Sequence, residues 1–154
     1  MTPIRLLLTL LDQAYDRRSW HGTNLRGSIR GLDADAASWR PGRGRHNIHE
    51  IVVHAAYWKY AVRRRLTGEK RGGFALKGSN WFTRDRSQWR EDVALLAASH
   101  RALRETVAGL TEADLRRRTP GTSFDGASLV GGIIAHDLYH AGQIQLLKRL
   151  RAGG

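Results

Sequence analysis

The sequence predicts an all-α fold, in which one domain over residues 1–154 forms an antiparallel four-helix bundle. Apolar residues recur at three- and four-residue steps in four long segments, as on the buried face of an amphipathic helix. No segment shows the period-two alternation that is typical of strands. The 154 residues, of which 41% are hydrophobic, are enough to bury one core without the support of disulfides or structural metals.

The first helix is expected at residues 4–30. Its apolar stripe consists of Leu7, Leu8, Leu11, Ala14 and Tyr15. Ser19 and Gly22 weaken this pattern, which leaves room for a break or bend near residue 20. Residues 31–46 contain Gly, Pro and Asp and predict a loop with at most a short turn of helix.

The second helix is expected at residues 47–67. Asn47 fits an N-cap, Glu50 can return a hydrogen bond to it, and Gly68 ends the helix. One face of this helix carries Ile51, His54, Ala55, Trp58 and Val62. Residues 68–82 form a Gly-rich loop that is longer than the usual connection in a bundle.

The third and fourth helices are expected at residues 83–109 and 127–151, with an irregular link at residues 110–126. The stripe of the third helix consists of Trp89, Val93, Leu96, Leu103 and Val107. Gly109 ends it. Four amphipathic segments without strands favour a helix bundle, and bundles build metal sites from side chains on facing helices.

The chain is strongly basic, with 26 Lys and Arg residues against 14 Asp and Glu residues and a net charge of +12. Such a charge is typical of proteins that bind phosphate-rich partners, either nucleic acid or an anionic small molecule. The basic residues are spread along the chain, however, and no RRM, KH or zinc-finger pattern surrounds them. We therefore keep nucleic-acid binding only as an alternative to a small-molecule substrate.

The absence of cysteine limits the chemistry open to the chain. It excludes disulfides, thiolate ligands and Cys nucleophiles, so a metal would have to be held by His, Asp, Glu or backbone oxygen. Asp12 and Asp16 interrupt the apolar run near the N-terminus, and no stretch approaches the roughly 18 apolar residues of a membrane span. We expect a soluble cytoplasmic protein that does not enter the membrane.

Two histidines of the fourth helix are candidate metal ligands. His136 and His140 lie four residues apart, which places both on one helix face among apolar neighbours. Buried imidazoles need partners, and a divalent metal would satisfy one nitrogen of each. The alternative is that both bond to backbone or to Asp137, whose place after His136 also excludes the zincin motif. Gln143 could orient a ligand or a substrate.

His54 is the best candidate for a third ligand, which a metal needs if it is to be held with positions left open. It lies in the middle of the second helix among apolar residues, where a histidine is often an ordinary core residue. His46 and His49 stand at the start of that helix and are expected to face solvent. His21 and His100 have polar neighbours and are expected on the surface.

Two segments carry a recognisable pattern, W-R-P-x(6)-I-x-E-I-V-V-H from Trp39 to His54 and H-D-L-Y-H-A-G-Q-I from His136 to Ile144. Together they resemble the DinB/YfiT-like family of metal-dependent enzymes. The resemblance implies an up-down-down-up four-helix bundle in which His54, His136 and His140 bind one divalent metal, nickel or zinc before others. It also implies a homodimer and a hydrolase or a transferase that uses a low-molecular-weight thiol as cofactor.

Three aromatic residues lie within one helical turn of the proposed ligands and could line a pocket or belong to the core: Tyr57, Trp58 and Tyr139. An open metal position would acidify a bound water or activate a thiol, and the sequence does not separate the two. No residue is identified as the general base. Besides an enzyme, the chain could be a metalloprotein with a structural or sensory ion, or a basic nucleic-acid-binding helical protein.

The loop before the second helix is expected closer to the metal than the loop after it. At 1.5 Å per residue, His54 lies about 10 Å from the start of its helix and about 20 Å from its end. We therefore expect Arg40, Arg43 or Arg45 to bind an anionic substrate, although exposed arginines are usually only solvated. Residues 68–82 are expected away from the metal unless they fold back along the bundle.

Overall fold

The structure of the chain is a computed structural model that describes residues 1–153. Within these residues the regular elements are all helices, which confirms the all-α prediction, and one isolated bridge joins Arg118 to Asp125. None of these helices combines the length and apolar character that a membrane crossing requires. The elements are α1 (Pro3–Tyr15), α2 (Leu25–Ile29), α3 (Ala34–Ser38), α4 (Ile48–Thr67), the 3₁₀ turn η1 (Arg86–Gln88), α5 (Trp89–Ala108), α6 (Glu112–Arg116) and α7 (Gly126–Gly153).

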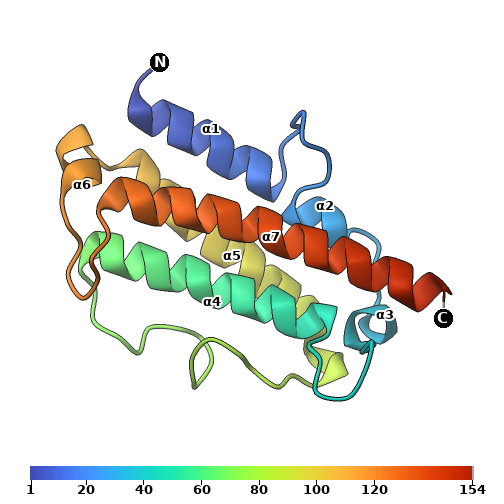
Figure 1. The fold of residues 1–154 in the computed structure, drawn as a ribbon. Coiled ribbons are helices and arrows are strands. Elements are labelled where there is room, and N and C mark those ends of the chain that lie inside the picture. The colour runs from blue at the N-terminus through green and yellow to red at the C-terminus, as the bar shows by residue number, and fades with distance from the viewer. Residues whose placement is uncertain (154) are drawn as a thin grey trace.

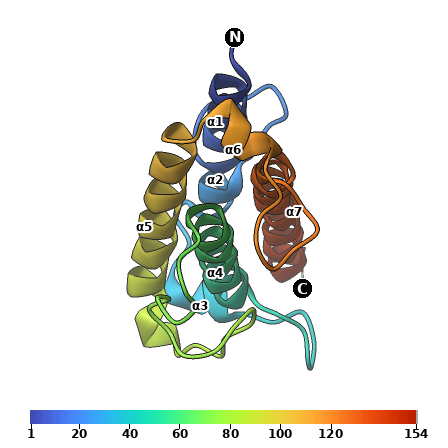
Figure 2. The ribbon, with the colours of Figure 1, turned by 90° about the vertical axis from the view of Figure 1, so that its left-hand side faces the viewer.

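The four long helices α1, α4, α5 and α7 lie side by side. Figure 1 shows α1 and α7 running in one direction and α4 and α5 in the other. Seen along the helices in Figure 2, α5 and α7 lie on opposite sides, with α1 and α4 between them. The long connection from α4 to η1 returns along the outside of α4, which is why two consecutive long helices can point the same way.

Two apolar clusters fill the space between the helices. The first lies around Val52 of α4 and Ile144 of α7, and the second around Leu11 of α1 and Val130 of α7. Residues of α4, α5 and α7 contribute to both clusters at successive turns. The core therefore extends over most of the length of these helices.

A buried polar layer separates the two clusters, and each long helix supplies one residue to it. Lys59 of α4 donates hydrogen bonds to Asp137 of α7 over 2.5 Å and to Nδ1 of His100 on α5 over 3.4 Å. The Tyr15 ring of α1 stacks on the His100 ring with their centroids 3.7 Å apart. All four side chains are buried. The layer places one ion pair in the middle of the core.

Local signals set several of the helix ends. Asn47 and Glu50 form the predicted capping box of α4, and Gly68 ends this helix in the left-handed conformation at φ +76°. The predicted first helix, in contrast, stops at Tyr15. The third begins at Trp89 rather than residue 83, because Asp85 caps the separate turn η1.

The expectation that His49 and His100 face solvent is wrong. Only 1% of His49 and 4% of His100 is exposed. His49 donates from Nε2 to a carboxylate oxygen of Asp92 over 2.7 Å, and His100 joins the polar layer. Their partners lie about forty residues away in the chain, so polar neighbours in sequence were a poor guide. His21 and His46 are exposed, as expected.

Candidate metal centre

The structure brings His54, His136 and His140 together between α4 and α7. Nε2 of His136 lies 3.1 Å from Nε2 of His54 and 3.1 Å from Nε2 of His140. One nitrogen from each ring belongs to a set whose members all lie within 4.8 Å of one another. Two nitrogens bound at about 2.0–2.1 Å to one tetrahedral zinc would be about 3.3 Å apart. The spacing therefore suits a single small cation.

Two of the rings are fixed by hydrogen bonds from the nitrogen that points away from the centre. Nδ1–H of His54 donates to the backbone carbonyl of Asn80 over 2.9 Å. Nδ1–H of His140 donates to Oε1 of Gln143 over 2.7 Å. Both rings consequently direct the lone pair of Nε2 toward His136. Partners of this kind hold metal-binding imidazoles in the required tautomer.

Without a metal, hydrogen bonds among the three rings do not satisfy all of the nitrogens that face the centre. A proton on Nε2 of His136 can be donated to His54 or to His140, but one proton does not satisfy both lone pairs well. A divalent cation accepts a lone pair from all three rings at once. His136 would then carry its proton on Nδ1, a buried atom that has no hydrogen-bond partner within residues 1–153. The donor set thus fits a divalent ion.

The three imidazoles are held in the form that binds metal. Burial lowers the pKa of His54 to about 4, and burial together with the neighbouring His140, His54 and Lys59 charges lowers the pKa of His136 to about 3. Burial also lowers the pKa of His140. All three rings are therefore neutral near pH 7, so that a metal does not have to displace a proton from them.

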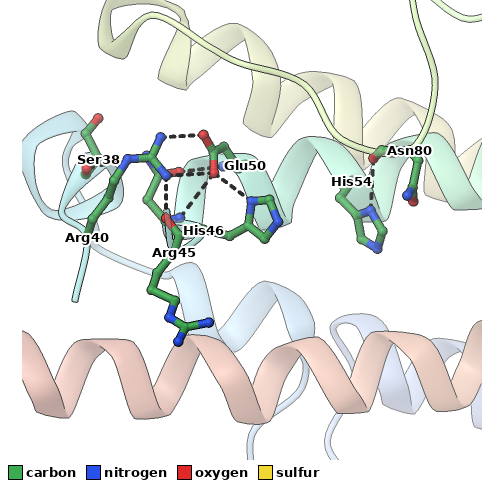
Figure 3. Close-up of polar contacts among 8 residues, drawn as sticks. Ser38, Arg40, Arg45, His46, Glu50, His54 and Asn80 are labelled. Atoms are coloured by element: carbon green, nitrogen blue, oxygen red, sulfur yellow. Dashed lines mark hydrogen bonds and ion pairs between the residues drawn. The ribbon is translucent and has the colours of Figure 1, made fainter. Parts of the chain in front are cut away.

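The connection that follows α4 folds back along the bundle and reaches the site. Asn80 supplies the carbonyl that holds His54, as Figure 3 shows, and its side-chain oxygen accepts a bond from Nε1 of Trp58 over 2.9 Å. The Trp81 ring stacks on the His54 ring with a centroid separation of 3.9 Å. From the sequence, this loop was expected to lie away from the three histidines unless it folded back along the bundle. It does fold back, and it contacts His54.

A hollow of about 560 Å³ opens beside the three histidines. All three line it, together with Tyr139 and Gln143. Trp58 approaches His54 and His136 edge-on from the other side, with ring centroids 6.4 Å away in both cases. Of the aromatic residues named from the sequence, Tyr139 and Trp58 therefore lie beside the histidines, whereas Tyr57 does not. Tyr57 turns away, packs on Phe74 and Phe82, and lines a different hollow.

The three arginines of the loop before α4 also differ in their placement. Arg45 lines the hollow, and its guanidinium points across toward α7 in Figure 3. Arg40 is engaged elsewhere, because it binds both carboxylate oxygens of Glu50. Arg43 is exposed and does not line the hollow. Of the three, Arg45 is the one that lines the hollow beside the histidines.

His46 is a residue of the hollow that sequence reasoning set aside as solvent-facing. Its Nδ1–H donates to Glu50 over 2.9 Å, and its ring stacks on Trp81 at 3.6 Å, on the opposite side of that indole from His54. Burial raises the pKa of Glu50, but hydrogen bonds from Arg40 and His46 and the Arg40 charge outweigh it and leave this pKa below its ordinary value. Glu50 is therefore a carboxylate that orients the His46 ring.

Comparison with protein families explains why these elements occur together. The model of the DinB superfamily matches residues 17–144, which include the three histidines of the site. The chain belongs to the DinB superfamily. Comparisons with curated proteins and with solved structures gave no match. The buried three-histidine cluster of this DinB protein is compatible with metal binding.

Asp137 does not bond to the neighbouring histidines of this DinB protein, contrary to the alternative weighed from the sequence. It lies on the core side of α7 and forms an ion pair with Lys59 of α4. Both side chains are fully buried. Because Asp137 is next to His136 in the helix, this pair fixes how α7 is rotated against α4. The rotation in turn directs His136 and His140 toward His54.

Proposed function

We propose that this DinB protein is a metal-dependent enzyme, either a hydrolase or a transferase that uses a low-molecular-weight thiol. The observation that carries the proposal is the convergence of three neutral imidazole nitrogens beside an open hollow. His54, His136 and His140 would hold one divalent ion, nickel or zinc, since imidazole suits both. Such an ion would supply Lewis acidity and lower the pKa of a bound water or thiol.

Residues around the three histidines would bind the substrate, transfer a proton and shape the wall of the hollow. Arg45 would bind an anionic group of a small-molecule substrate. His46, oriented by Glu50, would accept or return a proton at Nε2. Tyr139 and Gln143 would shape the wall next to His140. His46 is thus our proposed general base, a role for which the sequence alone identified no residue.

The proposal also includes a homodimer and the up-down-down-up bundle of the family. The directions of the long helices in Figure 1 support the bundle. Large apolar side chains exposed on one side of α7 support a second copy as partner, which would lie along the rim of the hollow that these residues also line: Tyr139, Leu146 and Leu150.

The hollow favours an enzyme over a structural or sensory ion, because a structural site is normally closed by a fourth protein ligand. Within residues 1–153, only these three histidines converge as a group able to hold a metal. A basic nucleic-acid-binding protein is less well supported, since several arginines are already paired with carboxylates, including Arg40, Arg63, Arg84 and Arg104.

An activity panel tests the proposal. Protein loaded with zinc or nickel is assayed for hydrolysis of anionic esters and for conjugation of glutathione and other small thiols to an electrophile. We expect metal-dependent turnover that is lost in His136→Ala. Arg45→Ala should raise KM for the anionic substrate, with smaller effects from Arg40→Ala and Arg43→Ala. Turnover that is as fast in His136→Ala, or absent across the panel with metal bound, would overturn the proposed function.

A further inference from the structure

A second hollow lies on the other side of His136. It has a volume of about 480 Å³ and runs between α4 and α7 toward the start of α7. His136 lines both hollows, so the three-histidine site is reached from this one as well. Its size is that of a pocket for a small organic molecule.

The walls of this second hollow combine apolar side chains with one imidazole and one guanidinium. Apolar side chains of both helices form the middle, among them Val62, Leu129 and Ile133. His136 stands at one end. Arg65 lines the hollow from α4, two turns after Trp58, and its guanidinium reaches back over the Trp58 ring. The chain thus offers an apolar channel between an imidazole and a guanidinium.

The guanidinium of Arg65 is held in place without an acidic partner. Its central carbon lies 5.8 Å from the centroid of the Trp58 ring. No carboxylate of residues 1–153 forms an ion pair with it, whereas Arg63, two residues earlier, binds Glu69. Thr122 and Ser128 line the same hollow and bring two hydroxyl groups. An oriented cation beside apolar walls and hydroxyl donors is suited to a carboxylate carried on an apolar body.

We propose that the second hollow binds a medium-chain organic acid, with its carboxylate on Arg65 and its far end at His136. The binding itself depends only on the hollow. The assignment of the far end as the reacting end rests on the proposed function. This proposal names a substrate class for the second hollow, an apolar acid, while the anionic group assigned to Arg45 would lie in the first hollow.

Calorimetric titration of metal-free protein tests the binding, with octanoate as the probe and octanol for comparison. We expect saturable binding of one octanoate per chain, tighter than octanol. Arg65→Ala should weaken octanoate binding at least about tenfold, or about 1.4 kcal/mol, because a charge-assisted hydrogen bond is lost, and should leave octanol binding nearly unchanged. Arg64→Ala is the matched control, because this neighbouring arginine does not line the hollow.

Two adjacent glycines of α7 give a second, independent test. Gly132 lines the hollow and Gly131 does not, and a Cβ at either position would meet no atom within 4 Å. Both positions therefore accept a Cβ without a clash, and leucine also favours the helix over glycine. Gly132→Leu should fill the hollow and abolish octanoate binding, while Gly131→Leu should bind as the wild type does. Circular dichroism of both variants confirms that the helices are retained.

Three results would overturn the proposal. One is the absence of saturable octanoate binding, and another is equal binding by Gly132→Leu. The third is binding that requires added zinc and ignores Arg65→Ala, because the carboxylate would then sit on the metal. A protein that binds octanoate without ever binding metal would contradict the proposed function and leave the acid site standing.

Discussion

Gln143 and Asn80 act on the site at the scale of single hydrogen bonds. Each accepts a hydrogen bond from the histidine nitrogen that faces away from the centre of the site. His54 and His140 are thereby kept in the tautomer whose Nε2 lone pair faces inward. The first of these partners was suggested by sequence spacing, because Gln143 lies one turn from His140. The second was not, because Asn80 is 26 residues from His54 and uses its backbone.

Replacing Gln143 by Leu tests this role at the same scale. The Nδ1–H of His140 loses its acceptor, so the ring can turn or adopt the other tautomer. We expect zinc affinity to fall about 10- to 100-fold, the usual effect of losing a partner of a metal-bound histidine. Competition with a chromophoric chelator measures the affinity. Gln145→Leu, two residues further along α7, is the control. If both variants bind zinc as tightly as the wild type, Gln143 does not hold His140 for metal binding.

The pair of Lys59 and Asp137 acts at the scale of helices, since it joins α4 to α7 in the middle of the core. Asp137→Asn leaves the Lys59 charge buried without its partner. We expect metal-free Asp137→Asn to be about 3–5 kcal/mol less stable than the wild type, as measured by urea unfolding. A double variant, Lys59→Met with Asp137→Leu, should recover most of this loss because no unpaired charge remains.

An exposed pair provides the comparison for that measurement. Glu69→Gln removes the partner of Arg63 at the surface, where an ion pair contributes about 0–1 kcal/mol. If Asp137→Asn unfolds at the same urea concentration as Glu69→Gln, the buried pair does not hold the helices in place.

The helices differ in how far the sequence could predict them. The ends of α4 follow from Asn47, Glu50 and Gly68, whose hydrogen bonds and conformation are local, and these predictions are confirmed. The pairing of His136 with His140 follows from helix periodicity. The return of the connection after α4 onto His54 depends on contacts such as the stacking of Trp81, which no local pattern encodes. Helix length alone placed that loop too far from the site.

Burial was likewise underestimated where a polar residue finds a distant partner. His49 pairs with Asp92 and His100 with Lys59, each across more than forty residues of chain. In sequence, these histidines resemble surface residues because their neighbours are polar. Only the packing of α4 against α5 brings the partners together.

At the scale of the whole molecule, the buried histidines make stability depend on pH. An unfolded chain protonates histidine near 6.5, whereas in the folded chain the pKa is about 4 for His54 and about 3 for His136 and His100. Between these values the unfolded state binds more protons, so stability is full above pH 6.5 and falls as pH falls. Each such histidine contributes about 1.4 kcal/mol per pH unit in that window.

We therefore expect the melting temperature of metal-free protein to drop steadily from pH 7 to pH 5, a range that lies above the ordinary pKa of Asp and Glu side chains. His100→Phe, which removes one titrating ring and keeps a ring stacked on Tyr15, should show a shallower dependence. Differential scanning calorimetry across this range measures both. A melting temperature that does not change between pH 7 and pH 5 would show that the histidines are not buried in neutral form.

The metal content of the purified protein tests the central claim most directly, namely that His54, His136 and His140 form one metal site. Protein produced without a polyhistidine tag is analysed for nickel, zinc and other first-row metals, alongside His136→Ala and, as the control, His21→Ala, which changes an exposed histidine. We expect about one divalent ion per chain in the wild type and in His21→Ala, and almost none in His136→Ala. Equal metal content in His136→Ala and the wild type would contradict it.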